Sequence, residues 1–159
     1  MYKKILFILT VLSLLLLVGC GPATKEFSGT GMTIQLNDSF VEKEVVQAPL
    51  YLESMNHIFM GMRESKLELA SYGIYDLEQY IEAVLDAHGK TATVNLYEDD
   101  DVKYYYAYYN ATVDREYGYM LFVMEGENHF YSMNFGCLES KLQGYKAQFQ
   151  AWAKTVSVV

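Results

Sequence analysis

The segment from residue 93 to residue 136 constrains the fold more than any other part of the sequence. It contains four β-rich runs separated by short polar breaks. Clusters of Asp, Glu, Arg, Asn and Gly between apolar runs are typical of tight turns that join antiparallel strands. The pattern therefore predicts a four-stranded meander, with strands over 93–98, 102–113, 117–125 and 129–135.

The two middle strands of this meander carry apolar side chains on both faces. Tyr104, Tyr106 and Tyr108 point to one side of the second strand, while Tyr105 and Tyr109 point to the other. The third strand is apolar through its middle without any alternation. A sheet with one solvent-exposed face has strands that alternate between apolar and polar residues. These strands do not alternate, so we expect a covering layer on each face of the sheet.

Two amphipathic segments can supply these layers. Residues 76–88 have apolar side chains at helical spacing, with Asp76 at the N-cap position and Gly89 where a left-handed C-terminal residue is wanted. Tyr75 and Tyr80 occupy the positions of a hydrophobic staple. A second apolar stripe predicts a helix from about 139 to 156, and it consists of Leu142, Tyr145, Phe149, Trp152 and Val156.

The region before the first helix contributes further strands. Alternating residues predict a strand over 32–36, and other strands are expected over 51–54 and 56–63. Since no repeat and no second linker follows residue 31, residues 32–159 are expected to form one domain. The expected fold class is α+β, with a mainly antiparallel sheet of about six strands between two helical layers.

This order of elements resembles the Mog1/PsbP family of α/β/α sandwich domains. The resemblance rests on residues 58–64 leading into the helix start at 75–81, on 121–125 and 130–136, and on the closing helix. It implies a long antiparallel sheet between helical layers and a role in binding or assembling other proteins. No binding residue carries over, because these residues form packing patterns and not a site motif.

The first twenty residues have the pattern of a bacterial export signal. Lys3 and Lys4 precede an apolar run over 5–18. As a helix this run measures about 21 Å, too short to cross a hydrocarbon core of about 30 Å. The run ends in Leu17-Val18-Gly19-Cys20, which resembles the lipobox of bacterial lipoprotein precursors. That resemblance implies cleavage before Cys20 and a diacylglycerol on its thiol, and an ordinary secretory signal with an incidental cysteine is the alternative.

Lipidation would divide the chain into a signal peptide (1–19), the lipidated Cys20 with a flexible tether (20–31), and the domain (32–159). It predicts a protein anchored on the extracytoplasmic side of the cell membrane, with the membrane and an envelope protein as partners. Loss of residues 1–19 removes two lysines, so 12 basic residues become 10, against 20 acidic ones. This acidic balance argues against nucleic acid as a partner and predicts a domain that stands away from anionic lipid head groups.

Side chains suited to catalysis or metal binding are sparse. His57, His88 and His129 have no His or Cys at ligand spacing, so no metal or other cofactor is expected. The acidic run 99–101 is more typical of a hairpin turn than of a calcium loop. Cys137 lies too far from His129 along one strand for a nucleophile and base pair, and packing in the core is its favoured role.

The tyrosines are the most unusual feature of the composition, at 15 of 159 residues, and they supply the candidate binding residues. These candidates are Tyr104, Tyr105, Tyr106, Tyr108 and Tyr109, for which packing in a two-sided core is the alternative. The leading functional hypothesis is a non-catalytic interaction or assembly module of the cell envelope, which predicts an exposed aromatic patch with an acidic rim. The alternatives are a small-molecule-binding lipoprotein with a closed tyrosine-rich pocket and, third, a thiol enzyme that uses Cys137.

Overall fold

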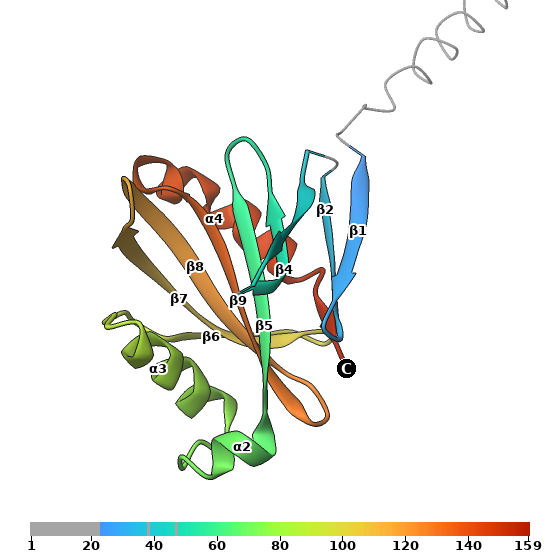
Figure 1. Ribbon diagram of the computed structural model, residues 1–159, viewed down its shortest axis with the longest axis vertical. Helices are drawn as coiled ribbons and strands as arrows, with labels where there is room; N and C mark the ends of the chain where they lie inside the picture. Colours follow the sequence, from blue (N-terminus) through green and yellow to red (C-terminus); the bar gives the residue numbers. More distant parts are fainter. Residues whose placement is uncertain (1–22, 38, 47) are drawn as a thin grey trace, which may run out of the picture.

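The computed structural model describes residues 23–37, 39–46 and 48–159. These residues form a seven-stranded antiparallel sheet of order β3-β4-β5-β9-β8-β7-β6 and a small sheet of order β1-β2-β10 (Figure 1). The strands are β1 (Thr24–Gly29), β2 (Met32–Asn37), β3 (Val41–Val45), β4 (Ala48–Glu53), β5 (Ile58–Ser65), β6 (Asn95–Glu98), β7 (Lys103–Thr112), β8 (Glu116–Glu125), β9 (His129–Leu138) and β10 (Ser157–Val158). The helices are α2 (Lys66–Ala70), α3 (Leu77–Ala87) and α4 (Glu139–Ala153).

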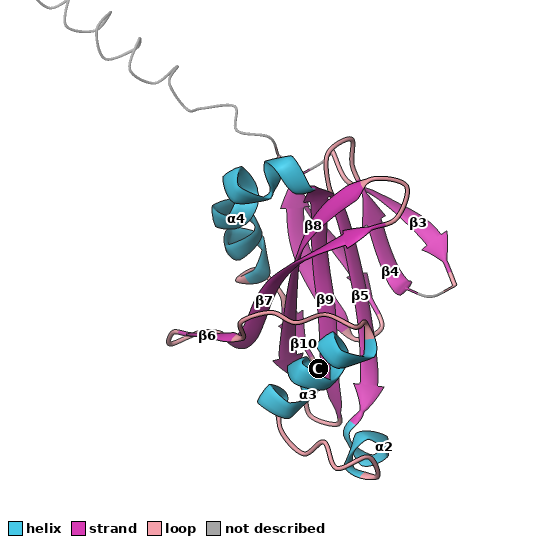
Figure 2. Cartoon of the chain, turned by 90° about the vertical axis from the view of Figure 1, so that its left-hand side faces the viewer, coloured by secondary structure: helices cyan, strands magenta, loops and turns pink. Residues whose placement is uncertain are grey.

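The large sheet lies between two helical layers. Helix α3 packs on one face, against β7, β8 and β9, and α4 packs on the opposite face, against β8 and β9 (Figures 1 and 2). We call these the α3 face and the α4 face. This arrangement confirms the predicted α+β class and the antiparallel sheet between helices.

The meander is confirmed as β6 to β9, and the strands expected over 32–36, 51–54 and 56–63 correspond to β2, β4 and β5. The large sheet has seven strands, close to the expected number of about six, and its edge strand β3 was not predicted. In the small sheet, β1 and the two-residue strand β10 were not predicted. Strand β3 reads Val-Glu-Lys-Glu-Val, and its charged side chains hide the alternation that marks a half-buried strand. The short helix α2 was also not predicted.

Helix α3 begins and ends where the sequence predicts. The Asp76 carboxylate accepts the N–H of Gln79 at 2.8 Å, and the Gln79 side chain accepts the N–H of Tyr75 at 2.8 Å. Gly89 follows the last turn with φ +62°, a conformation that glycine adopts without strain. The hydrophobic staple was wrong, because Tyr75 points to solvent while Tyr80 is buried.

The N-terminal part of the domain differs from the expected tether over 20–31. Residues Thr24–Gly29 form β1, which pairs with β2, and Phe27 is buried in the core. The small residues that suggest a linker form the hairpin turn between these strands, where Thr30 and Gly31 have φ +51° and +82°. The described domain therefore begins well before residue 32.

Aromatic side chains dominate the core on the α4 face. Phe135 of β9 lies between Phe122 and Phe149, with ring centroids 5.4 and 5.3 Å away, and Trp152 lies 5.5 Å from it. Close aromatic pairs of this kind contribute about 0.5–1.5 kcal/mol each beyond the area they bury. These contacts fix α4 on the sheet.

Candidate interaction surfaces

The structure divides the five candidate tyrosines of β7 between the two faces of the sheet. Tyr104, Tyr106 and Tyr108 lie on the α4 face, and Tyr105 and Tyr109 lie on the α3 face. Tyr104 is fully buried and the other four are half-buried. The five side chains therefore do not form one common patch.

The hydroxyl groups of three of these tyrosines form hydrogen bonds with side chains of α4 and β9. Tyr104 donates to the Gln150 side chain of α4, which in turn donates to the Tyr108 hydroxyl at 3.2 Å. Tyr109 donates to Oδ1 of Asn134 at 3.0 Å. Burial raises the pKa of Tyr104 and Tyr109 well above the ordinary value, so both hydroxyls stay protonated and can donate.

The histidine that lies next to Cys137 is His57, because His129 lies at the other end of β9. Ile58 pairs with Gly136, so the register brings His57 and Cys137 next to each other, and both line a cavity of about 330 Å³. Burial raises the pKa of the Cys137 thiol to about 11 and lowers the pKa of His57. An activated thiol needs the opposite shifts. Cys137 is 2% exposed, which confirms its packing role.

Three exposed large side chains, a leucine and two tyrosines, lie on α2 and in the loop that follows it. Leu67, Tyr72 and Tyr75 are 84%, 81% and 71% exposed. This segment forms the end of the molecule that lies furthest from the first residues of β1 (Figure 1). We call these three side chains the α2 patch.

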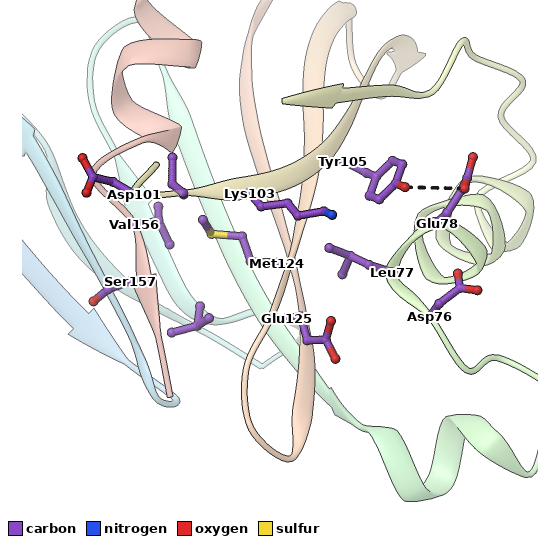
Figure 3. A pocket seen from close by; sticks show the side chains of 12 residues that line it. Asp76, Leu77, Glu78, Asp101, Lys103, Tyr105, Met124, Glu125, Val156 and Ser157 are labelled. Carbon is purple, nitrogen blue, oxygen red and sulfur yellow. Dashed lines mark hydrogen bonds between the residues drawn. The ribbon is translucent and has the colours of Figure 1, made fainter. Parts of the chain in front are cut away.

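Asp76, the residue that follows Tyr75, lines a groove of about 680 Å³ (Figure 3). Four carboxylates line it, and its apolar surface comes from α3, β8 and the C-terminal segment. Its lining includes the carboxylates Asp76, Glu78, Asp101 and Glu125 and the apolar Leu77, Met124, Val156 and Val158. We call it the acidic groove.

The charges of the acidic groove are mostly unbalanced by its own side chains. Lys103 lines the groove, but its Nζ atom also forms an ion pair with Glu98 Oε1 at 3.4 Å. Glu125 forms an ion pair with Lys66. The Tyr105 hydroxyl points toward Glu78 at 3.5 Å. An acidic groove with apolar side chains at its base suits a ligand that carries both positive charge and apolar groups.

The α2 patch was not predicted from the sequence, because the candidate binding residues all come from the tyrosine-rich strand β7. One signal was available. Tyr72-Gly73-Ile74-Tyr75 lies just before a capped helix and has no strand alternation. Tyrosines outside any periodic pattern are the ones that a core is least able to bury.

A second cavity, of about 520 Å³, lies between the C-terminal half of α3 and the strands β4, β5 and β9. Thr30 Oγ1 and Ser132 Oγ, both from residues that line it, are buried and have no hydrogen-bond partner within the described part of the chain. Ser132 is only 1% exposed. Thr30 also has φ +51°, which is strained for a β-branched residue.

The remaining predicted features are simpler. The acidic run 99–101 is a hairpin turn in which Asp99 Oδ1 accepts the N–H groups of Asp101 and Val102. Among the described residues, no group of three or more His, Cys, Asp or Glu side chains is arranged to hold a metal ion. No helix within 23–159 is long and apolar enough to span a membrane. The predicted lipidation site, Cys20, lies outside the described residues.

Comparison with known proteins identifies the fold. No family model and no curated protein matches the sequence. Among solved structures, cyanobacterial PsbP from Synechocystis aligns with a TM-score of 0.57 and 14% identity over 90% of this chain and 99% of that one. The yeast Ran-binding protein Mog1p, from Saccharomyces cerevisiae, aligns with a TM-score of 0.51 and 10% identity over 87% of this chain and 97% of its own.

A Bacteroides thetaiotaomicron protein aligns equally well, with a TM-score of 0.57 and 13% identity over 85% of this chain. The chain spans only 48% of that longer protein. At such identities the likeness concerns the fold alone. The domain has the Mog1/PsbP-like fold.

Proposed function

We propose that this protein is a lipid-anchored, non-catalytic interaction module of the bacterial cell envelope, which binds a partner protein through the α2 patch and the acidic groove. The observation that supports this most directly is the exposure of Leu67, Tyr72 and Tyr75 beside a groove with acidic walls. Exposed aromatic residues supply rigid contact area at low entropic cost, and acidic surroundings select the partner by charge.

The placement of this surface suits an anchored protein. The lipobox-like sequence ends at Cys20, shortly before β1, and the α2 patch lies at the other end of the domain (Figure 1). A lipid on Cys20 would therefore leave the α2 patch pointing away from the bilayer. Its accessibility to another envelope protein would not depend on movement of the domain.

The chemistry of the acidic groove indicates the kind of partner. Asp76, Glu78 and Asp101 face a groove whose base is apolar. A segment with Lys or Arg beside apolar side chains would match both features. The binding should weaken at high salt, because the attraction between the exposed charges is screened.

A crosslinking experiment in cells tests this proposal. A photo-reactive amino acid is placed at position 72 in the full-length protein, and the matched control carries it at Val46, which is exposed elsewhere. We expect a defined partner to crosslink from position 72, to be lost in the Cys20→Ala variant, and to be absent from position 46. Equal crosslinking from both positions would contradict the proposal.

The purified partner then allows a quantitative test with the full-length protein. Tyr72→Ser with Tyr75→Ser should weaken binding by about tenfold or more, as loss of aromatic anchors does. Glu78→Gln should weaken binding and reduce its salt dependence. Glu82→Gln, one turn further along the exposed face of α3, serves as the control. Unchanged affinity in the double tyrosine variant would show that the α2 patch is not the binding surface.

Small-molecule binding is a second candidate, which the cavity beneath α3 favours. Its unpartnered Ser132 and Thr30 hydroxyls would accept or donate hydrogen bonds to a ligand, and a volume of about 520 Å³ is within the usual range for such sites. A small-molecule library would be screened by thermal shift. Ser132→Ala should abolish the shift of a genuine ligand without lowering the Tm of the ligand-free protein. A shift that survives this change would place the ligand elsewhere.

A further inference from the structure

Four exposed apolar side chains gather at one end of the domain. Met55 and Val113 are 96% and 75% exposed, and Val41 and Leu138 are also exposed. They come from four segments: the start of β3, the turn between β4 and β5, the turn between β7 and β8, and the end of β9. Residues distant in sequence thus place four exposed apolar side chains at one end of the domain, and we call this end the apolar end surface.

The strand register shows that these segments share one end. Glu53 lies opposite both Val41 and Ile58, and Ile58 lies opposite Gly136. The 54–57 turn and Leu138 lie just beyond this row of residues. The hairpin tip at 113–115 extends beyond it as well, because Tyr117 pairs with Leu138.

The chain enters the domain at this same end. Thr24, the first residue of β1, pairs with Asn37, the last residue of β2, and Val41 follows four positions later. In Figure 1 the start of β1, the β4–β5 turn and the start of α4 lie at the top of the molecule. The apolar end surface therefore lies beside the point where the chain leads back to Cys20.

The short connection limits how far this end can be from a lipid on Cys20. Three residues lie between Cys20 and Thr24, and the four steps from one Cα atom to the next span at most about 14 Å in a fully extended chain. The head-group layer on each side of a bilayer is itself several ångströms thick. A domain tied this closely has its entry end within about 14 Å of the lipidated residue, at the head groups or just beyond them.

We infer that this end of the domain lies flat against the lipid bilayer, with Met55 and Val113 inserted at the boundary between head groups and acyl chains. The inference rests on the proposed lipid anchor at Cys20. It replaces the sequence-based expectation of a domain standing off the membrane, which assumed a tether as far as residue 31.

Apolar contact drives this docking more than charge does. Arg115 and Lys141 lie at this end and can reach lipid phosphates, but Arg115 is paired with Asp114 at 3.3 Å, and Glu116 and Glu139 lie nearby. These five side chains carry two positive and three negative charges, so charge does not attract this end to an anionic bilayer. High salt should therefore not weaken the docking, whereas it should weaken the binding of a basic partner to the acidic groove.

Depth-dependent fluorescence quenching tests the inference on the full-length lipidated protein. Met55→Cys is labelled with an environment-sensitive fluorophore and reconstituted into phosphatidylethanolamine–phosphatidylglycerol vesicles that contain a doxyl-labelled lipid. Leu67→Cys, at the opposite end, is the matched control. The unsubstituted protein checks that buried Cys137 is not labelled.

We expect the fluorophore at position 55 to lose most of its emission in doxyl vesicles, and the fluorophore at position 67 to lose none. Val113→Asp in the Met55→Cys protein should restore the emission without detaching the protein from vesicles. Equal emission from positions 55 and 67 on protein that floats with the vesicles overturns the docking alone. Failure of the full-length protein to float, with no mass increase on Cys20, overturns the lipid anchor and the docking together.

Discussion

Leu142 of α4 packs directly on Gly118 of β8. A Cβ atom built on Gly118 would lie 2.7 Å from Leu142 Cδ2 and 2.8 Å from Leu142 Cβ. Because the Leu142 Cβ atom moves only with the helix backbone, a side chain at position 118 would push α4 away from the sheet. We expect Gly118→Ala to destabilise the domain by about 1–3 kcal/mol, measured by urea unfolding.

Gly144 in the same helix provides the control for that prediction. A Cβ atom at Gly144 meets nothing within 4 Å, and the residue lies in the middle of α4. Gly144→Ala should stabilise the protein by about 0.5–1 kcal/mol, because alanine has less backbone freedom to lose. Similar unfolding midpoints for the two variants would contradict the close packing of Leu142 on Gly118.

The N-cap of α3 should contribute measurably to stability. Asp76→Ala removes the acceptor for the Gln79 N–H and is expected to cost about 1 kcal/mol, a decrease of roughly 4 °C in Tm by calorimetry. Asp86→Ala, in the last turn of the same helix, should have no destabilising effect, because a negative charge there opposes the helix dipole. A larger loss from Asp86→Ala would show that the cap is not the source.

The Cys137 thiol should make stability fall at alkaline pH. Its pKa is raised from 9.0 to about 11 by burial, so above pH 9 the unfolded chain loses a proton that the folded chain keeps. This contribution to stability is complete below pH 9 and is lost as the pH rises through about 11. Cys137→Ala should lose less stability than the unsubstituted protein between pH 8.5 and pH 10.5, by urea unfolding.

Reagent access provides a separate check on Cys137. The side chain is 2% exposed, so a maleimide should react with the folded domain only as fast as the domain unfolds. Rapid labelling at neutral pH without denaturant would revive the thiol-enzyme hypothesis, which the two pKa shifts at Cys137 and His57 oppose.

His57 should make stability fall at acidic pH. Its ring packs edge-on against Tyr145 at 4.3 Å and Trp152 at 5.2 Å, and burial lowers its pKa from 6.5. The unfolded chain therefore binds a proton below pH 6.5 that the folded protein resists, and stability is lost as the pH falls. His57→Phe keeps an aromatic ring and should flatten the decline in Tm between pH 7 and pH 5. His88→Gln, at an exposed position, should decline as the unsubstituted protein does.

The sequence predicted those parts of the fold that have a local signal. The capped helix α3 and the meander β6 to β9 follow from spacing and turn residues, and the apolar residues on both faces of β7 and β8 predicted the two helical layers. Strand β3 was missed because its side chains are charged, and β1 because a Ser-Gly-Thr-Gly turn looks like a linker. Both strands form hairpins with the next strand along the chain, so their partners are local, and they were missed because their own residues lack a clear strand pattern.

The candidate sites were predicted less well, for a related reason. Exposure depends on what packs over a residue, and the sequence does not show that. Tyr104 is buried under α4, whereas Tyr72, in a less conspicuous stretch, points to solvent. Similarly, the pairing of Ile58 with Gly136 brings His57 to Cys137, and no spacing rule along the chain could indicate that.

The small sheet can be completed only when the last residues of the described chain are present, because β10 is one of its three strands. Strand β10 pairs with β2, the Thr33 and Ser157 hydroxyls lie 2.7 Å apart, and the Val159 N–H donates to the Gly31 carbonyl at 3.1 Å. A contact between residues 33 and 157 spans 124 positions, so it has one of the highest loop-closure costs available to this chain. During synthesis, β2 therefore lacks one of its neighbours until β10 has emerged. A nascent chain of this protein remains incompletely folded until residues 157 and 158 have left the ribosome.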